Sequence, residues 1–153
     1  SAIVKATSYE HDENGITTEE PEAISRMQRK RLRKRKALEK ALEQYETVKI
    51  YGNPDSKTVL LCWGSTKGAC LEVAEALNLK VVQPLLLEPL PIEPLKSALS
   101  GADKIIAVEV NATGQLATLI CGHGICIDDM ILRFDARPFT VDALLDNVKE
   151  VLL

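Results

Sequence analysis

Short apolar runs alternate four times with helix-length segments after residue 57, and this alternation most constrains the fold. The runs cover residues 58–63, 81–87, 104–110 and 130–134, and three are continuous enough to be strands buried on both faces. Between and after them lie 67–78, 91–100, 113 to about 123, and 141–153, with apolar residues at helical spacing. Repeated strand–helix units favour right-handed crossovers. We therefore expect the α/β class, a three-layer α/β/α domain with a mostly parallel sheet.

A different pattern precedes this region. Thr17 stands three residues before Glu20 and four before Pro21, a capping-box spacing, and no Gly or Pro then occurs until Gly52. This predicts one long helix over roughly 19–47. Its apolar stripe is thin, so it needs something else to pack on. The turn-forming cluster at 52–56 places a boundary there, with a basic helical linker over 17–57 and the α/β domain over 58–153.

The linker carries seven Lys and Arg side chains within residues 29–36. One interpretation is a nucleic-acid contact that neutralises phosphates. Against it, no aromatic is interleaved, the charges spread around the helix, and the chain as a whole is acidic, with a net charge of −3. We favour a solvated or subunit-facing helix and no nucleic-acid partner. Repulsion between like charges predicts that this helix frays or is disordered in isolation.

Composition narrows the setting further. No apolar run approaches the ~18–20 residues of a membrane helix, and the N-terminus has no export signal. The four cysteines are too few for a disulfide framework. These features predict a cytoplasmic protein without a membrane partner.

The segment Gly64-Ser65-Thr66-Lys67-Gly68 follows the first predicted strand of the domain and opens a helix. Backbone N–H groups at such a point attract anions. The spacing matches neither the Walker nor the dinucleotide pattern. Gly64 as a turn residue and Ser65 as an N-cap explain the segment without a ligand, and both interpretations stay open.

Cys121-Gly-His-Gly-Ile-Cys126 resembles a metal knuckle, with His123 as a third ligand. However, no second Cys/His pair is placed to complete four ligands, and no iron–sulfur spacing occurs. We expect no metal here, and a helix end with cysteines as small core residues is the simpler interpretation.

No catalytic triad signature is present, and we expect no catalytic residue. Glu109, at the end of a predicted strand, is the most suggestive polar group, followed by Asn111, Gly114 and Gln115. Strand carboxyl ends at a switch point of the sheet are where such folds bind ligands. A carboxylate there could equally cap the next helix through its N-terminal amides.

Taken together, these motifs resemble the C-terminal part of the alpha subunit of the 2-oxoacid:ferredoxin oxidoreductases. The resemblance covers nearly the whole chain, with one departure at Ala136, where the family usually has glycine. The motifs that carry it, in order, are Glu10-His11-Asp12-Glu13-Asn14-Gly15, then Met27, Arg31 and Lys34, Gly64-Ser65-Thr66, Pro89-Leu90-Pro91, Glu109-Val110-Asn111, Gly114-Gln115-Leu116, and Asp135-Ala136-Arg137-Pro138-Phe139.

The resemblance implies a transketolase C-terminal-like domain over 58–153, preceded by residues 1–16 as the tail of a pyrimidine-binding domain. It implies thiamine diphosphate, Mg²⁺ and iron–sulfur clusters in the assembled enzyme and no cofactor in this chain. The expected partners are a beta subunit and the remaining alpha-subunit domains, with coenzyme A and ferredoxin reached through the assembly. The family reaction is oxidative decarboxylation of a 2-oxoacid to an acyl-CoA, CO₂ and reduced ferredoxin; this piece alone is expected to be inactive and to have a structural role.

The candidates for an interface or anion contact come from two strand ends and one later turn. They are Gly64, Ser65, Thr66, Glu109, Asn111, Gly114, Gln115 and Arg137. We expect Glu109, Asn111 and Gln115 to face a neighbouring domain or subunit. The alternative is a free-standing nucleotide- or anion-binding module that uses the Gly64 turn.

Overall fold

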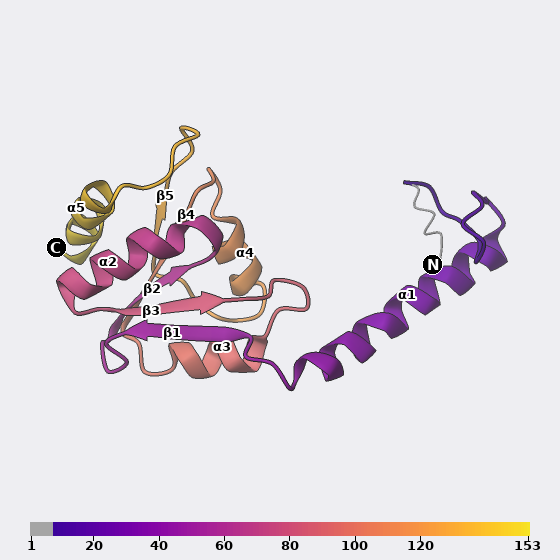
Figure 1. The fold of residues 1–153 in the computed structure, drawn as a ribbon, viewed down its shortest axis with the longest axis horizontal. Helices are drawn as coiled ribbons and strands as arrows, with labels where there is room; N and C mark the ends of the chain where they lie inside the picture. Colours follow the sequence, from indigo (N-terminus) through magenta and orange to yellow (C-terminus); the bar gives the residue numbers. More distant parts are fainter. Residues whose placement is uncertain (1–7) are drawn as a thin grey trace. The chain divides into compact units, whose positions relative to one another are not determined.

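The structure is a computed structural model that describes residues 8–153. It divides into two compact units between Tyr45 and Glu46 (Figure 1). Each unit is described separately below. The predicted tail over 1–16 lies partly outside the described residues.

The second unit is built on one five-stranded sheet. The strands are β1 (Val48–Gly52), β2 (Thr58–Cys62), β3 (Lys80–Pro84), β4 (Lys104–Glu109) and β5 (Asp129–Leu132). Their order is β1-β3-β2-β4-β5. The contacts of β2 with β3, of β2 with β4 and of β4 with β5 are parallel, whereas β1 is antiparallel to β3. The prediction of a mostly parallel sheet is confirmed.

Helices cover both faces of this sheet (Figure 1). One face packs on α3 (Ile92–Leu99) and α4 (Gln115–Cys121), and the other on α2 (Lys67–Leu77) and α5 (Val141–Leu152). Successive residues of β2 alternate between the two cores, because strand side chains point to opposite faces in turn: Val59 and Leu61 enter one, Leu60 and Cys62 the other. The three-layer α/β/α architecture predicted from the sequence is therefore confirmed.

Strand β1 is the element that the sequence interpretation missed. Residues 48–52 were assigned to the helical linker, but they form the antiparallel edge of the sheet. The run is short and continues a stretch without Gly or Pro, so it carries no local signal that separates it from the helix before it. The compact unit consequently begins at Glu46, whereas the boundary was predicted near 52–56.

The first unit contains helix α1 (Pro21–Leu42) and the loop before it. The helix is shorter than the predicted 19–47, although proline does stand in its first turn. The predicted capping box is wrong: the N-cap residue is Glu20, without a side-chain cap, and Thr17 instead forms a β-bridge with His11. The role of α1 as a linker and its fraying in isolation stay predictions.

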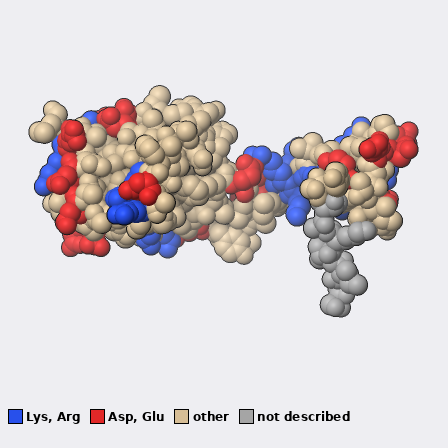
Figure 2. All heavy atoms as spheres, turned by 90° about the horizontal axis from the view of Figure 1, so that it is seen from above, with Lys and Arg blue, Asp and Glu red and all other residues tan. Residues whose placement is uncertain are grey.

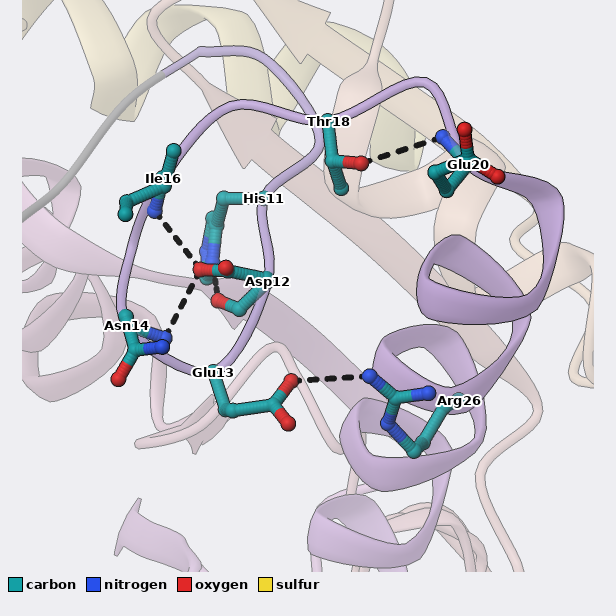
Figure 3. Close-up of polar contacts among 8 residues, drawn as sticks. All are labelled: His11, Asp12, Glu13, Asn14, Ile16, Thr18, Glu20 and Arg26. Atoms are coloured by element: carbon teal, nitrogen blue, oxygen red, sulfur yellow. Dashed lines mark hydrogen bonds and ion pairs between the residues drawn. The ribbon is translucent and has the colours of Figure 1, made fainter.

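Polar contacts hold the loop over 8–20 against α1 (Figure 3). Asp12 Oδ1 accepts the N–H groups of Asn14 and Ile16, both at 2.9 Å, and closes the turn. Arg26 of the helix donates to Glu13 at 3.0 Å. Met27 is the one buried residue of α1. Charge and backbone hydrogen bonds, more than apolar burial, therefore organise this unit.

Among residues 8–153, no helix is long and apolar enough to cross a bilayer.

Candidate functional site at the carboxyl edge of the sheet

The chain reverses its direction across the sheet between β2 and β4. From β2 it crosses to β3 on one side, and it then returns through α3 to β4 on the other side. Such a switch point leaves a crevice beyond the strand carboxyl ends, where α/β proteins bind ligands. The structure shows a shallow hollow of about 230 Å³ there, and its lining residues are Trp63, Gly64, Ser65, Thr66, Val110 and Asn111.

Glu109, at the end of β4, is completely buried. Its Oε1 accepts the N–H of Ala117 at 2.9 Å, and its Oε2 accepts the N–H of Leu116 at 2.8 Å and the amide Nδ2 of Asn111 at 2.7 Å. Backbone N–H groups at a helix start have no partner within the helix and attract a negative charge. Glu109 therefore caps the start of α4, which is one of the two interpretations made from the sequence.

The residues after Glu109 shape the same turn. Asn111 Oδ1 accepts the N–H groups of Thr113 at 3.1 Å and of Gln115 at 3.2 Å. Gly114 has a φ of 62°, and a Cβ there would lie 2.5 Å from Met130 Sδ. The positive φ favours glycine here, whereas the flexible, half-exposed Met130 side chain can move aside. The side chain of Gln115 is exposed, so Asn111 and Gly114 build the turn while Gln115 is available for contact.

The Gly64 turn differs from its prediction. Gly64 has a φ of 56° and open space around it. Residues Gly64–Thr66 form a short 3₁₀ helix, in which Thr66 Oγ1 donates to the Trp63 carbonyl at 2.9 Å and accepts the Trp63 N–H at 3.3 Å. Helix α2 begins only at Lys67, without a side-chain cap. The N-cap role predicted for Ser65 is therefore wrong, and Ser65 stands exposed beside the hollow.

Arg137 lies in a turn after β5 rather than in the lining of the hollow. Asp135 organises this turn: its carboxylate accepts Arg133 Nε at 2.9 Å, Arg133 Nη2 at 3.0 Å and the Arg137 N–H at 3.1 Å. The Arg133 guanidinium lowers the pKa of Asp135 below its usual value. Because Arg133 also lies over the Phe139 ring, at 5.8 Å, the turn is braced on both sides while the Arg137 side chain stays exposed.

Exposed apolar residues near these strand ends escaped the sequence interpretation. Val110 is 38% exposed, Met130 53% and Phe134 71%. Ile131 belongs to the core on the α2 and α5 side, so its neighbour Met130 points to the other face of β5. The apolar residues at the even-numbered positions of 130–134 were the signal for this exposed surface. They become informative only once it is known that α4 covers β4 and leaves this face of β5 uncovered.

The four cysteines do not gather into a metal centre. Cys62 and Cys70 are buried in the core, whereas Cys121 and Cys126 are exposed. A hydrogen bond with Cys62, together with burial, raises the pKa of the Cys70 thiol, so it stays protonated. Within residues 8–153 no group of three or more His, Cys, Asp or Glu side chains is placed to hold a metal ion.

The known proteins that are similar to this chain carry the name of one kind of enzyme subunit. No family model matches it. The alpha subunit of a 2-oxoacid:ferredoxin oxidoreductase from Saccharolobus solfataricus is 34% identical over 158 residues, which cover 99% of this chain and 25% of that protein. The alpha subunit of 2-oxoacid:ferredoxin oxidoreductase 2 from Aeropyrum pernix is 35% identical with the same coverage. The chain is therefore similar, over nearly its whole length, to part of the alpha subunits of 2-oxoacid:ferredoxin oxidoreductases.

A solved structure shows the same similarity. The 2-oxoglutarate:ferredoxin oxidoreductase from Magnetococcus marinus, solved with 2-oxoglutarate, coenzyme A and succinyl-CoA bound, matches with a TM-score of 0.70 and 28% identity. The match covers 99% of this chain and 27% of that one. The chain thus spans about a quarter of the length of the alpha subunits that it resembles.

Proposed function

We propose that residues 46–153 form a non-catalytic domain of a 2-oxoacid:ferredoxin oxidoreductase alpha subunit, and that the carboxyl edge of its sheet binds a neighbouring domain or subunit. The assembled enzyme would convert a 2-oxoacid and coenzyme A to an acyl-CoA and CO₂ and would reduce ferredoxin. The beta subunit and the remaining alpha-subunit domains would carry the chemistry. The chain by itself would be inactive.

The state of Glu109 carries this proposal. A catalytic carboxylate must reach a substrate proton or a metal, but Glu109 is fully buried and both its oxygens accept hydrogen bonds from within the domain. Moving it toward a substrate would leave the first N–H groups of α4 unpaired in an apolar setting, which is costly. The residue most suggestive of chemistry in the sequence therefore has a structural task.

The apolar groups beside it support the binding role. Val110, Met130 and Phe134 expose large apolar surfaces next to a turn that is ordered by hydrogen bonds between Arg133 and Asp135. Aromatic residues and Met are enriched in protein interfaces. Such a surface is suited to a protein neighbour more than to a small polar substrate.

The donor groups of the domain do not fit the cofactors of the family. A Mg²⁺-diphosphate site requires free oxygen ligands, and the buried carboxylate at the edge has none to give. An iron–sulfur cluster takes four cysteine thiolates, but here the cysteines are split between the core and the surface. We infer that thiamine diphosphate, Mg²⁺ and the clusters are held elsewhere in the assembly.

Charge insertion at the apolar edge tests the binding role. In the full-length alpha subunit expressed with its beta subunit, Met130→Glu together with Phe134→Glu should lower the yield of assembled enzyme at least about tenfold, because a buried unpaired charge is costly. The control is Ile50→Glu, at a 47% exposed position on the opposite edge strand, which should leave assembly unchanged. Normal assembly of the double variant would refute the interface.

Calorimetry separates this domain from a catalytic one. Titration of the 153-residue chain with thiamine diphosphate and Mg²⁺ should give no micromolar binding, and such binding would contradict the proposed inactivity. A thermal-shift series with nucleotides and coenzyme A tests the anion-binding alternative, because a ligand that binds only the native state raises the melting temperature.

A further inference from the structure

Helix α1 carries more positive charge than its surroundings neutralise. It holds nine Lys and Arg side chains against Glu22 and Glu39. Arg26 pairs with Glu13, Arg31 with Glu10, and Arg35 with Glu39. Within residues 8–153 the side chains of six others make no hydrogen bond or ion pair, and all six are exposed. They are Arg29, Lys30, Arg33, Lys34, Lys36 and Lys40.

Four of these cations line one face of the helix. Arg29, Arg33, Lys36 and Lys40 are spaced 4, 3 and 4 residues apart, which at 3.6 residues per turn places them in one stripe about 16 Å long. Like charges at this spacing repel each other. An opposed row of carboxylates would remove that repulsion, so the stripe favours an acidic partner surface.

The α/β unit presents such a surface on its outer α2 and α5 layer. Asp142, Asp146 and Glu150 are spaced four residues apart along α5 and span about 12 Å. Glu72 and Glu75 are exposed on α2, which packs beside α5. None of these five carboxylates has an ion-pair partner among the described residues, and Lys149 is the only cation of α5. Figure 2 shows acidic side chains, with basic ones beside them, at the end of the unit where Figure 1 places α5.

We propose that the stripe of α1 in one copy of this chain binds the acidic face of α2 and α5 in a second copy. The two surfaces are opposite in sign and similar in helical spacing, and they run for about 16 and about 12 Å. A two-fold arrangement would form the contact twice, with each copy giving its helix and receiving the other's. This inference is independent of the carboxyl-edge interface, which lies at the strand ends and not on the outer face of these helices.

Sedimentation velocity on the 153-residue chain tests the proposal. At pH 7 and 50 mM NaCl we expect a dimer, with a dissociation constant that rises at least about tenfold by 300 mM NaCl, because salt screens exposed charges. A monomer at every protein concentration in low salt would overturn the proposal. So would a concentration-independent compaction, which indicates docking within one chain, or co-purifying nucleic acid detected by absorbance.

Charge exchange identifies the two surfaces. The double variant Arg29→Glu/Arg33→Glu should be monomeric at 50 mM NaCl, and so should Asp142→Lys/Asp146→Lys. An equimolar mixture of the two should dimerise again, because each acidic helix meets a basic face and each remaining basic helix meets an acidic one. Failure of the mixture to dimerise would refute the pairing.

Lys30→Glu/Lys34→Glu is the matched control for the stripe. It changes net charge as much as Arg29→Glu/Arg33→Glu but acts on another side of α1, so it should leave most of the dimer intact. An equal loss in both variants would show that only net charge matters and would overturn the proposed geometry. Circular dichroism of each variant checks that α1 and the sheet are still folded.

Discussion

The two units of the chain are stabilised in different ways. Residues 46–153 enclose two apolar cores, one on each face of a sheet. In the part of the first unit that the structure describes, α1 buries only Met27, and exposed ion pairs and a hydrogen bond join it to the preceding loop. Burial of apolar surface is strongly stabilising, whereas exposed ion pairs contribute little and are screened by salt. The first unit therefore depends on partners far more than the second.

Two glutamates make this contrast measurable, because each accepts three hydrogen bonds. Glu10 accepts Gln28 Nε2 at 2.7 Å and Arg31 Nη1 on both its oxygens, at 3.0 and 2.8 Å, at an exposed position. Glu109 accepts two backbone N–H groups and the Asn111 amide in the interior. The bonding is equal in number, but the two sites differ in burial and in the kind of donor, which is side chains at Glu10 and mainly backbone N–H groups at Glu109.

The largest effect is predicted at Glu109. Glu109→Ala should lower the free energy of unfolding of the α/β unit by about 3 kcal/mol or more, because it leaves buried N–H groups unpaired and opens a cavity. Glu10→Ala should cost less than about 1 kcal/mol in its own unit. Urea unfolding measures the first change, and hydrogen exchange of the Thr18 amide, which donates to the Glu10 carbonyl, follows the second. Similar costs at the two sites would contradict the comparison.

The sequence predicted the interior of the α/β unit well, because continuous apolar runs report burial on both faces. Predicted strands at 58–63 and 104–110 match β2 and β4 to within one residue. It failed at β1, where a half-exposed edge strand has no such run. An edge strand is determined by its neighbour in the sheet, here β3, and that neighbour is distant in sequence.

The site predictions likewise succeeded where local sequence decides the structure and failed where distant residues decide it. The strand-end rule correctly brought Gly64 and Asn111 to one hollow. It could not decide whether Glu109 was free or a cap, because that depends on where the N–H groups of Leu116 and Ala117 point. The exposure of Phe134 likewise depends on which helix covers which strand, and short-range spacing does not contain that information.

A second prediction concerns substitutions at two residues with positive φ, one in each unit. Ala136 has a φ of 63° and Gly15 a φ of 75°. A side chain at positive φ costs about 1–2 kcal/mol, and part of this is offset because glycine loses more entropy on folding. Ala136→Gly should therefore stabilise the α/β unit by about 0.5 kcal/mol, and Gly15→Ala should destabilise the loop over 8–20 by about 1 kcal/mol.

Urea unfolding measures the effect of Ala136→Gly. Hydrogen exchange of the Ile16 amide measures the effect of Gly15→Ala. Phe134 should remain exposed in Ala136→Gly, and labelling of solvent-accessible side chains can verify this. A loss of stability in Ala136→Gly would mean that the turn after β5 gains more from a stiff backbone than it loses through strain.

The smallest predicted effect compares two aspartates that close turns. Hydrogen bonds from the Ile16 and Asn14 N–H groups lower the pKa of Asp12, and the Arg133 side chain lowers that of Asp135. A folded-state pKa below the unfolded value of about 3.9 means that each turn is stabilised above that pH and loses its closure as pH falls through the lower, folded pKa.

NMR titration of the Ile16 and Arg137 amides should show both midpoints below 3.9. Added salt, or Arg133→Gln, should raise the midpoint at Asp135 and leave Asp12 nearly unchanged, because an ion pair is screened whereas a backbone hydrogen bond is not. An equal salt response at both would show that charge, and not the backbone, closes the Asp12 turn.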